Sequence, residues 1–85
     1  MCTYLNERLP VSGAGKGAAG WFTLTDASVS FDHPACASPD HSLNIDFLNP
    51  GEGPAARVAV ELEPASALAL AEAILNTLRA APEGL

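Results

Sequence analysis

Two runs of alternating apolar and polar residues, joined by a turn and followed by an alanine-rich segment, constrain this fold more than any other feature. Leu43, Ile45 and Phe47 alternate with polar residues, and the even-numbered positions of residues 56–62 are apolar. Period-two alternation is typical of a strand with one buried face. The sequence Asn-Pro-Gly-Glu-Gly-Pro separates the runs and predicts a turn, so we expect an antiparallel hairpin.

The alanine-rich segment, residues 64–81, predicts one helix. Pro64 stands where the first helical residue is favoured, and alanine propagates a helix well. Its apolar side chains recur at helical spacing and form a stripe: Ala67, Leu70, Ala71, Ile74 and Leu78, with Leu68 and Leu75 beside it. A helix with so few polar residues is more apolar than a small monomer can easily bury, so we expect a homodimer.

The first half of the chain predicts two further extended segments. Residues 3–11 alternate without a purely apolar face, and Pro10 suits an edge or a strand end. In residues 21–32 the apolar positions change parity, which predicts a bulge or kink near Asp26–Ala27 or two short strands.

Residues 12–20 form a glycine-rich connection between these segments. They contain a formal G-x-G-x-x-G, but a strand-like sequence follows instead of the helix that a dinucleotide site requires. The Walker pattern fails as well, because Gly17 stands where Ser or Thr is needed. We therefore expect a hairpin loop, with a mobile flap over a site as the alternative.

Together these elements predict an α+β fold, ββββα, in which an antiparallel sheet of about four strands carries one C-terminal helix on one face. A chain of 85 residues without a linker or repeat predicts a single domain over residues 1–85. With 48% hydrophobic and 16% charged residues, the composition is that of a folded protein.

The charge balance excludes two classes of partner. The chain has 10 acidic and 4 basic side chains, a net charge of −6, so it has no basic face for nucleic acid or for an anionic membrane. The N-terminus lacks the features of a signal peptide, and the longest apolar run is too short to span a bilayer. We therefore expect a cytoplasmic protein.

The residues best suited to chemistry lie between the second and third predicted strands. His33, Cys36 and His41 have the spacing H-x2-C-x4-H, and Asp32 and Asp40 precede the two histidines. Imidazole and thiolate are preferred ligands of transition metals such as Zn, Cu, Ni or Fe. An aspartate could complete the site or fix an imidazole tautomer by accepting its second N–H.

Cys2 is a further candidate ligand. If Met1 is removed, the thiol and the α-amine of Cys2 could chelate a metal together, or the residue could act as an N-terminal nucleophile. To reach the histidines, the first strand would have to begin beside their loop.

Plainer interpretations of the same residues remain open. Asp-His pairs occur in ordinary solvated turns, and Cys36 between two alanines suits a small buried apolar residue. A disulfide between Cys2 and Cys36 is chemically feasible but unusual in a reducing compartment. No base–nucleophile pair is identifiable from spacing, so we assign no catalytic residue.

The opening Met-Cys-Thr-Tyr, the segment GWFTLTDASVSFDHP and the runs DHSLNIDFLNP and GPAARVAVEL resemble an uncharacterised family of small bacterial proteins, a domain of unknown function of about this length. The resemblance covers nearly the whole chain and implies a complete protein. It implies no activity, cofactor or partner. The family is expected to carry a further histidine near the position of Cys36, so either a ligand has been exchanged for another or this position is not a ligand.

These observations predict a small transition-metal-binding protein that uses His33, Cys36 and His41, assisted by Cys2, Asp32 or Asp40. The alternative is a non-enzymatic interaction or accessory module that docks on a protein partner through its sheet face or its helix. A small enzyme that uses Cys2 is the third hypothesis.

Overall fold

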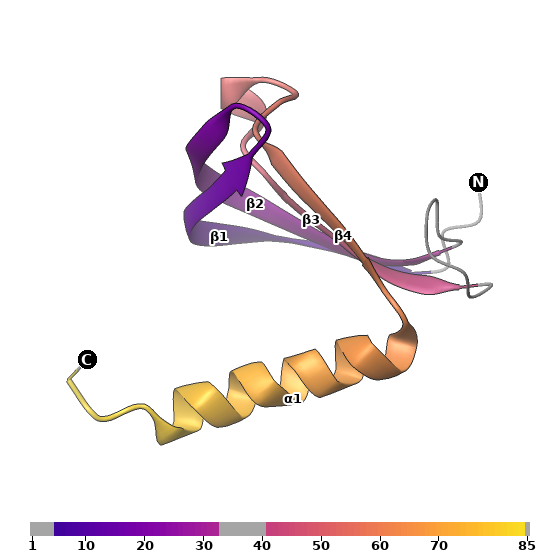
Figure 1. Cartoon of the computed structure of the whole chain (residues 1–85), viewed down its shortest axis with the longest axis vertical. Helices are drawn as coiled ribbons and strands as arrows, with labels where there is room; N and C mark the ends of the chain where they lie inside the picture. The colour runs from indigo at the N-terminus through magenta and orange to yellow at the C-terminus, as the bar shows by residue number, and fades with distance from the viewer. Residues whose placement is uncertain (1–4, 33–40, 85) are drawn as a thin grey trace.

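The computed structural model describes residues 5–32 and 41–84, which form one sheet and one long helix (Figure 1). The elements are β1 (Leu5–Gly17), β2 (Gly20–Asp32), β3 (Ser42–Leu48), the 3-10 turn η1 (Pro50–Glu52), β4 (Arg57–Leu62) and α1 (Pro64–Ala80). The strands are antiparallel throughout and lie in the order β1-β2-β3-β4. The predicted ββββα fold is confirmed.

The hairpin expected from the alternating runs is β3 and β4, in which Ile45 lies opposite Val60 and Phe47 lies opposite Val58. Asn49 organises its turn. The Asn49 side-chain oxygen accepts a hydrogen bond from the Gly51 amide at 3.1 Å, and its Nδ2 donates to the Thr23 carbonyl at 2.9 Å. One asparagine therefore joins this turn to β2.

For residues 21–32, the alternative of two short strands is wrong, and the bulge predicted near Asp26 is found in the adjoining strand. β2 is one strand of 13 residues, and the irregularity lies on its partner β1, between Pro10 and Gly13. Three steps along β1 there match two steps along β2, from Asp26 to Leu24, so β1 holds the extra residue of a bulge. Proline cannot donate to a ladder, which makes Pro10 a suitable place for the pairing to slip.

The glycine-rich stretch is mostly strand, and only residues 18–19 lie between β1 and β2. This hairpin tip approaches β4 so closely that a Cβ on Gly17 would lie 2.9 Å from the Ala55 carbonyl oxygen. Phe22 lies beside Gly17 and lines a small hollow with Ala55 and Ala56. Because the apolar positions of β2 change parity, Phe22 lies in a small cluster at this hairpin tip.

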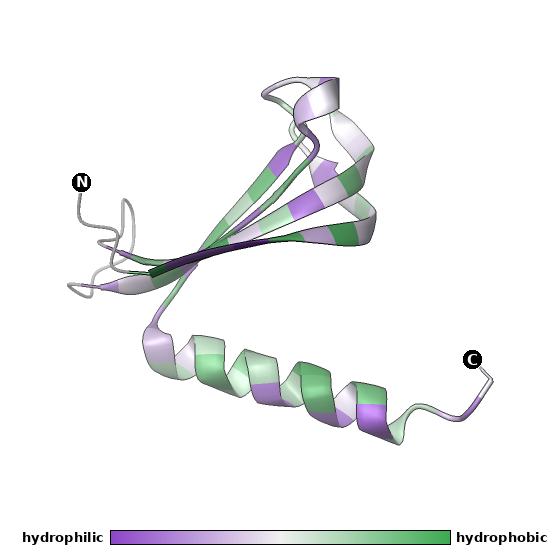
Figure 2. Ribbon diagram, turned by 180° about the vertical axis from the view of Figure 1, so that it is seen from behind, coloured by the Kyte–Doolittle hydropathy of each residue, from purple (hydrophilic) through white to green (hydrophobic). Residues whose placement is uncertain are grey.

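Strand register separates the sheet into an apolar and a polar face. Across the four strands, Leu5, Phe31, Leu43 and Leu62 form one apolar row, and Val29, Ile45 and Val60 belong to the next, where β1 contributes Glu7. Intervening positions carry polar side chains such as Ser28 and Asp46. The alternation is visible along the strands in Figure 2.

α1 begins directly after β4, with only Glu63 between them. Figure 1 shows the helix running beneath the sheet and separating from it toward its C-terminal end. Ala67, near the start, is the one half-buried residue of α1, and its other residues are exposed. Among the described residues, the buried apolar side chains are only Ala27 and Ala56. The helix therefore covers little of the apolar face.

The described part of the chain has no helix with the length and apolar character needed to cross a bilayer.

Candidate functional site

Two regions could carry function: the end of the sheet where the predicted metal ligands begin, and the apolar surface between the sheet and α1. Of the predicted ligands, Asp32 and His41 lie in the described part of the chain. Cys2, His33, Cys36 and Asp40 lie outside the described residues.

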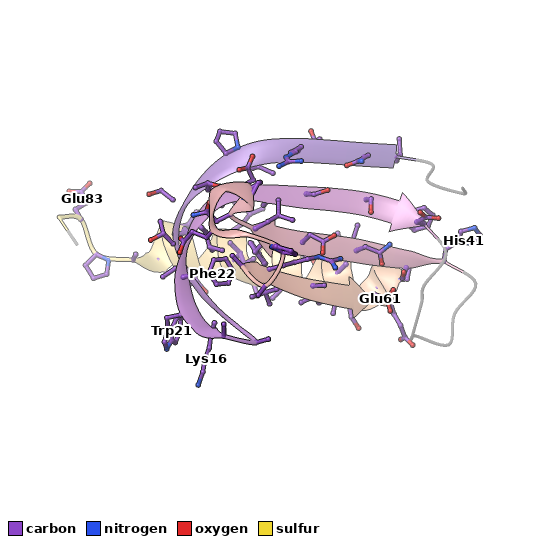
Figure 3. All side chains as sticks on the ribbon, turned by 90° about the horizontal axis from the view of Figure 1, so that it is seen from above. Lys16, Trp21, Phe22, His41, Glu61 and Glu83 are labelled. Carbon is purple, nitrogen blue, oxygen red and sulfur yellow. The ribbon has the colours of Figure 1, made fainter. Side chains whose placement is uncertain are left out.

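Asp32 and His41 lie at the same end of the sheet. Asp32 is the last residue of β2 and pairs with Ser42, which directly follows His41 in the sequence. Ser42 is completely buried, and its hydroxyl donates to the Asn44 side-chain oxygen at 2.6 Å, which fixes the start of β3. His41 is labelled at this end of the sheet in Figure 3.

β1 begins at this end too, because Leu5 pairs with Phe31. For Cys2 to reach the histidines, the first strand has to begin beside their loop. Two residues lie between Cys2 and Leu5, and these three steps along the chain span at most about 11 Å when extended. β1 therefore begins at the same end of the sheet as Asp32 and His41, and Cys2 lies outside the described residues.

His41 stacks on Phe31 of β2. The ring centroids are 5.4 Å apart and the ring planes differ by 8°. Stacking of this kind holds the imidazole in one orientation and covers one of its faces. Within residues 5–32 and 41–84, no group of three or more His, Cys, Asp or Glu side chains is arranged to hold a metal ion.

The second region is an apolar groove of about 410 Å³ between α1 and the sheet. Its lining comes from the sheet and from the predicted helix stripe: Val29, Phe31, Leu43, Ile45, Pro64, Ala67, Leu68, Leu70, Ala71 and Ile74. None of these side chains carries a charge or a polar group. A second hollow, of about 370 Å³, continues past Phe31 and Leu43 toward Leu5 and Glu7 on the edge strand.

The walls of the groove are open to solvent. Leu68 is 64% exposed, Leu70 45% and Ile74 51%. A folded protein of this size rarely leaves so many large apolar side chains next to one another in water, and such surfaces mark interaction sites. Phe31 belongs both to this groove and to the stack with His41, so the two candidate regions are adjacent.

The opposite face of the sheet is polar, and ion pairs link neighbouring strands across it. Arg57 Nη2 lies 2.6 Å from Asp46 Oδ1 across β3 and β4, and Arg8 Nε lies 3.3 Å from Asp26 Oδ2 across β1 and β2. A hydrogen bond from the Thr25 hydroxyl, 2.7 Å away, together with the nearby Arg8, lowers the pKa of Asp26. Exposed pairs of this kind contribute little to stability.

The sequence identified the helix side of the groove but not its sheet side. The β2 and β3 residues of the lining were expected to form a core beneath the helix. The signal for a groove was the excess of apolar residues on a helix joined to its strand by one residue.

The comparison with curated proteins and the comparison with solved structures each give no match. A family model, described as a family of unknown function, matches residues 1–85. The match agrees with the resemblance found in the sequence and assigns no activity. The chain belongs to this family of unknown function (DUF6295).

Proposed function

We propose that this protein is a non-enzymatic interaction module that binds a protein surface in the apolar groove between α1 and the sheet. The observation that carries the proposal is the groove itself, about 410 Å³ in volume, lined by apolar side chains and open to solvent. Burying apolar surface contributes roughly 25 cal/mol per Å², so covering these walls is strongly favourable.

The chemistry of the lining supports binding over catalysis. A catalytic site needs groups that donate, accept or transfer protons or attack a substrate. The ten lining residues offer none of these groups. Apolar grooves beside a helix are a recurring way to bind an amphipathic helix, which places its own apolar face between the walls.

Site-specific photo-crosslinking in the producing cells tests the proposal. Benzoylphenylalanine replaces Leu70 in the groove wall, and the matched control carries it at Ala69, which is exposed on the opposite side of the helix from the apolar stripe. We expect cross-links to a protein from position 70 and none from position 69, with mass spectrometry identifying the cross-linked sequence. A groove variant that forms no cross-link contradicts the proposal.

Transition-metal binding at the end of the sheet is the second candidate function. The observation in its favour is that β1 begins at the end of the sheet that carries Asp32 and His41. The ligand set would be drawn from His33, Cys36 and His41, with Cys2, Asp32 or Asp40 assisting. Thiolate and imidazole ligands favour Zn, Cu, Ni or Fe.

Elemental analysis of protein purified without a histidine tag tests this candidate. We expect close to one equivalent of a transition metal in the wild type, and loss of it when His33 and His41 are both changed to Ala. Circular dichroism of that variant should still show the sheet and the helix. Less than about a tenth of an equivalent in the wild type, with no uptake on titration, removes the metal function.

A further inference from the structure

We infer that the occupant of the groove is a second copy of this chain, with α1 of each copy packed against the groove of the other about a two-fold axis. The inference rests on the proposed function, because it names the partner of the same groove. Three observations carry it: the junction between β4 and α1, the surface left exposed, and the width of the apolar arc on α1.

The junction directs α1 away from its own sheet. Glu63 alone separates Leu62, the end of β4, from Pro64, the first residue of the helix. Glu63 is extended, with φ −61° and ψ 143°, because a residue before proline is disfavoured in the helical region. One restrained residue leaves little freedom to fold the helix flat onto the sheet. Short junctions of this kind favour pairing between copies over closure within one chain.

The chain exposes more surface than a compact monomer of its mass. The accessible surface is 6146 Å². A compact chain of this mass exposes about 4,700 Å², so the excess is about 1,400 Å². A stable interface buries about 800 Å² on each partner. The radius of gyration, 14.3 Å, likewise exceeds the value of about 12 Å for a compact chain of 85 residues.

The apolar arc of α1 is wide enough for two contacts. At 100° per residue, the side chains from Leu70 through Ile74 to Leu68 span about 160° of the helix circumference, more than the roughly 100° stripe that packs on one surface. Glu72 and Arg79 lie outside this arc. An assembly of two chains that each carry a net charge of −6 can therefore bury the arc without bringing charged side chains together.

A two-fold arrangement uses all of this surface. An isologous interface places the same patch on both copies, so each chain contributes one groove and one helix. The C-terminal half of each α1, with Ile74 and Leu78 exposed, then lies at the open end of the other groove. A partner of different sequence would have to supply its own matching apolar helix.

Sedimentation equilibrium of the purified full chain is the first test. We expect a species of twice the 8.7 kDa protomer mass at micromolar concentration. The change Ile74→Glu should weaken the dimer about thirtyfold or more, as loss of a central contact does. The matched control Ala73→Glu, on the neighbouring position outside the arc, should leave the mass unchanged. A monomeric wild type, or a dimer that Ile74→Glu does not weaken, overturns the inference.

Because Ile74 is half exposed within the protomer, Ile74→Glu places no charge in the protomer core. Leu78→Glu is the second variant, near the end of the helix, where local fraying does not disturb the sheet. We expect both variants to keep the wild-type far-ultraviolet circular dichroism spectrum. If Ile74→Glu does not fold, the mass of Leu78→Glu decides, and a stable dimer of that variant overturns the inference.

Photo-crosslinking of the purified protein separates this inference from the proposed function. Benzoylphenylalanine at position 70 should join two copies of this chain, through peptides of β2, β3 or α1. Cross-links in cells to a different protein, with none between copies in the purified chain, overturn the inference and leave the interaction module standing. The lack of any cross-link from position 70 removes both.

Discussion

The imidazole of His41 stacks on the ring of Phe31 with 5.4 Å between the centroids, and Phe31 also lines the apolar groove. The stack therefore joins the end of the sheet, where the predicted metal ligands begin, to the surface proposed to bind a partner. A molecule that covers Phe31 in the groove lies next to this imidazole. A change at the end of the sheet or in the groove can therefore be detected through the His41 imidazole.

We expect Phe31→Leu to lose the stack and to lower the free energy of unfolding by about 0.5–1.5 kcal/mol beyond the effect of the lost apolar area. The His41 ring protons should move downfield in the NMR spectrum as the ring current is removed. Phe47→Leu is the control, because Phe47 pairs with Ala27 and Val58 and removes a similar apolar area elsewhere. Unchanged His41 shifts in Phe31→Leu contradict the stack.

Gly17→Ala should destabilise the protein by about 1–3 kcal/mol, the usual cost of overpacking. The added Cβ would lie 2.9 Å from the Ala55 carbonyl oxygen and 3.3 Å from that of Arg57, so backbone must move. The measurement is urea unfolding followed by circular dichroism.

Gly13→Ala is the matched control on the same strand, since nothing lies within 4 Å of its added Cβ. We expect it to be neutral or to stabilise by about 0.4–1 kcal/mol through the unfolded chain. Equal costs for the two substitutions would show that the hairpin tip does not lie against β4.

The sequence predicted the parts of this fold that local patterns determine. Period-two alternation identified β3 and β4, and Pro64 marked the first residue of α1, because both signals are read from neighbouring residues. The bulge was assigned to β2 instead of β1 for a physical reason. A parity change in one strand does not reveal that its partner, near Pro10, holds the extra residue.

The relation between α1 and the sheet was beyond sequence reasoning. An apolar stripe predicts that a helix will be covered, but it does not say by which surface. That outcome depends on Glu63, the single residue between β4 and α1. Its backbone angles set the direction in which the helix leaves the sheet, and a sequence pattern does not give that direction. For the metal site, the sequence named six residues, and the structure describes two of them, Asp32 and His41, at one end of the sheet.

We expect Asp26→Asn to lower stability at pH 7 and to have no effect in strong acid. The pKa of Asp26 is lowered in the folded state, first by the Thr25 hydroxyl and then by Arg8, so folding favours the ionised carboxylate. Its contribution is full above the ordinary value of 3.8 and is lost as the pH falls through the lowered folded value.

Urea unfolding of the wild type and of Asp26→Asn, from pH 7 down to the acid limit of folding, checks this sign. Thr25→Val should bring the pKa of Asp26 back toward its ordinary value, as followed by the carboxyl carbon shift. A stability difference that grows as the pH falls would contradict the assignment.

Lengthening the junction between β4 and α1 should shift the protein from dimer toward monomer. Inserting Gly-Ser-Gly after Glu63 adds about 10 Å of flexible chain, which is enough for α1 to turn back onto its own sheet. The helix stripe then covers its own apolar face, and the driving force for pairing falls. Sedimentation equilibrium should show a weaker dimer, and the monomer should have a smaller radius of gyration than the 14.3 Å of the open protomer.

The same insertion between Ala18 and Ala19 in the β1–β2 turn is the control, because that turn lies away from the groove. If the lengthened junction leaves the dimer as strong as in the wild type, the direction imposed by Glu63 is not what leaves the groove open.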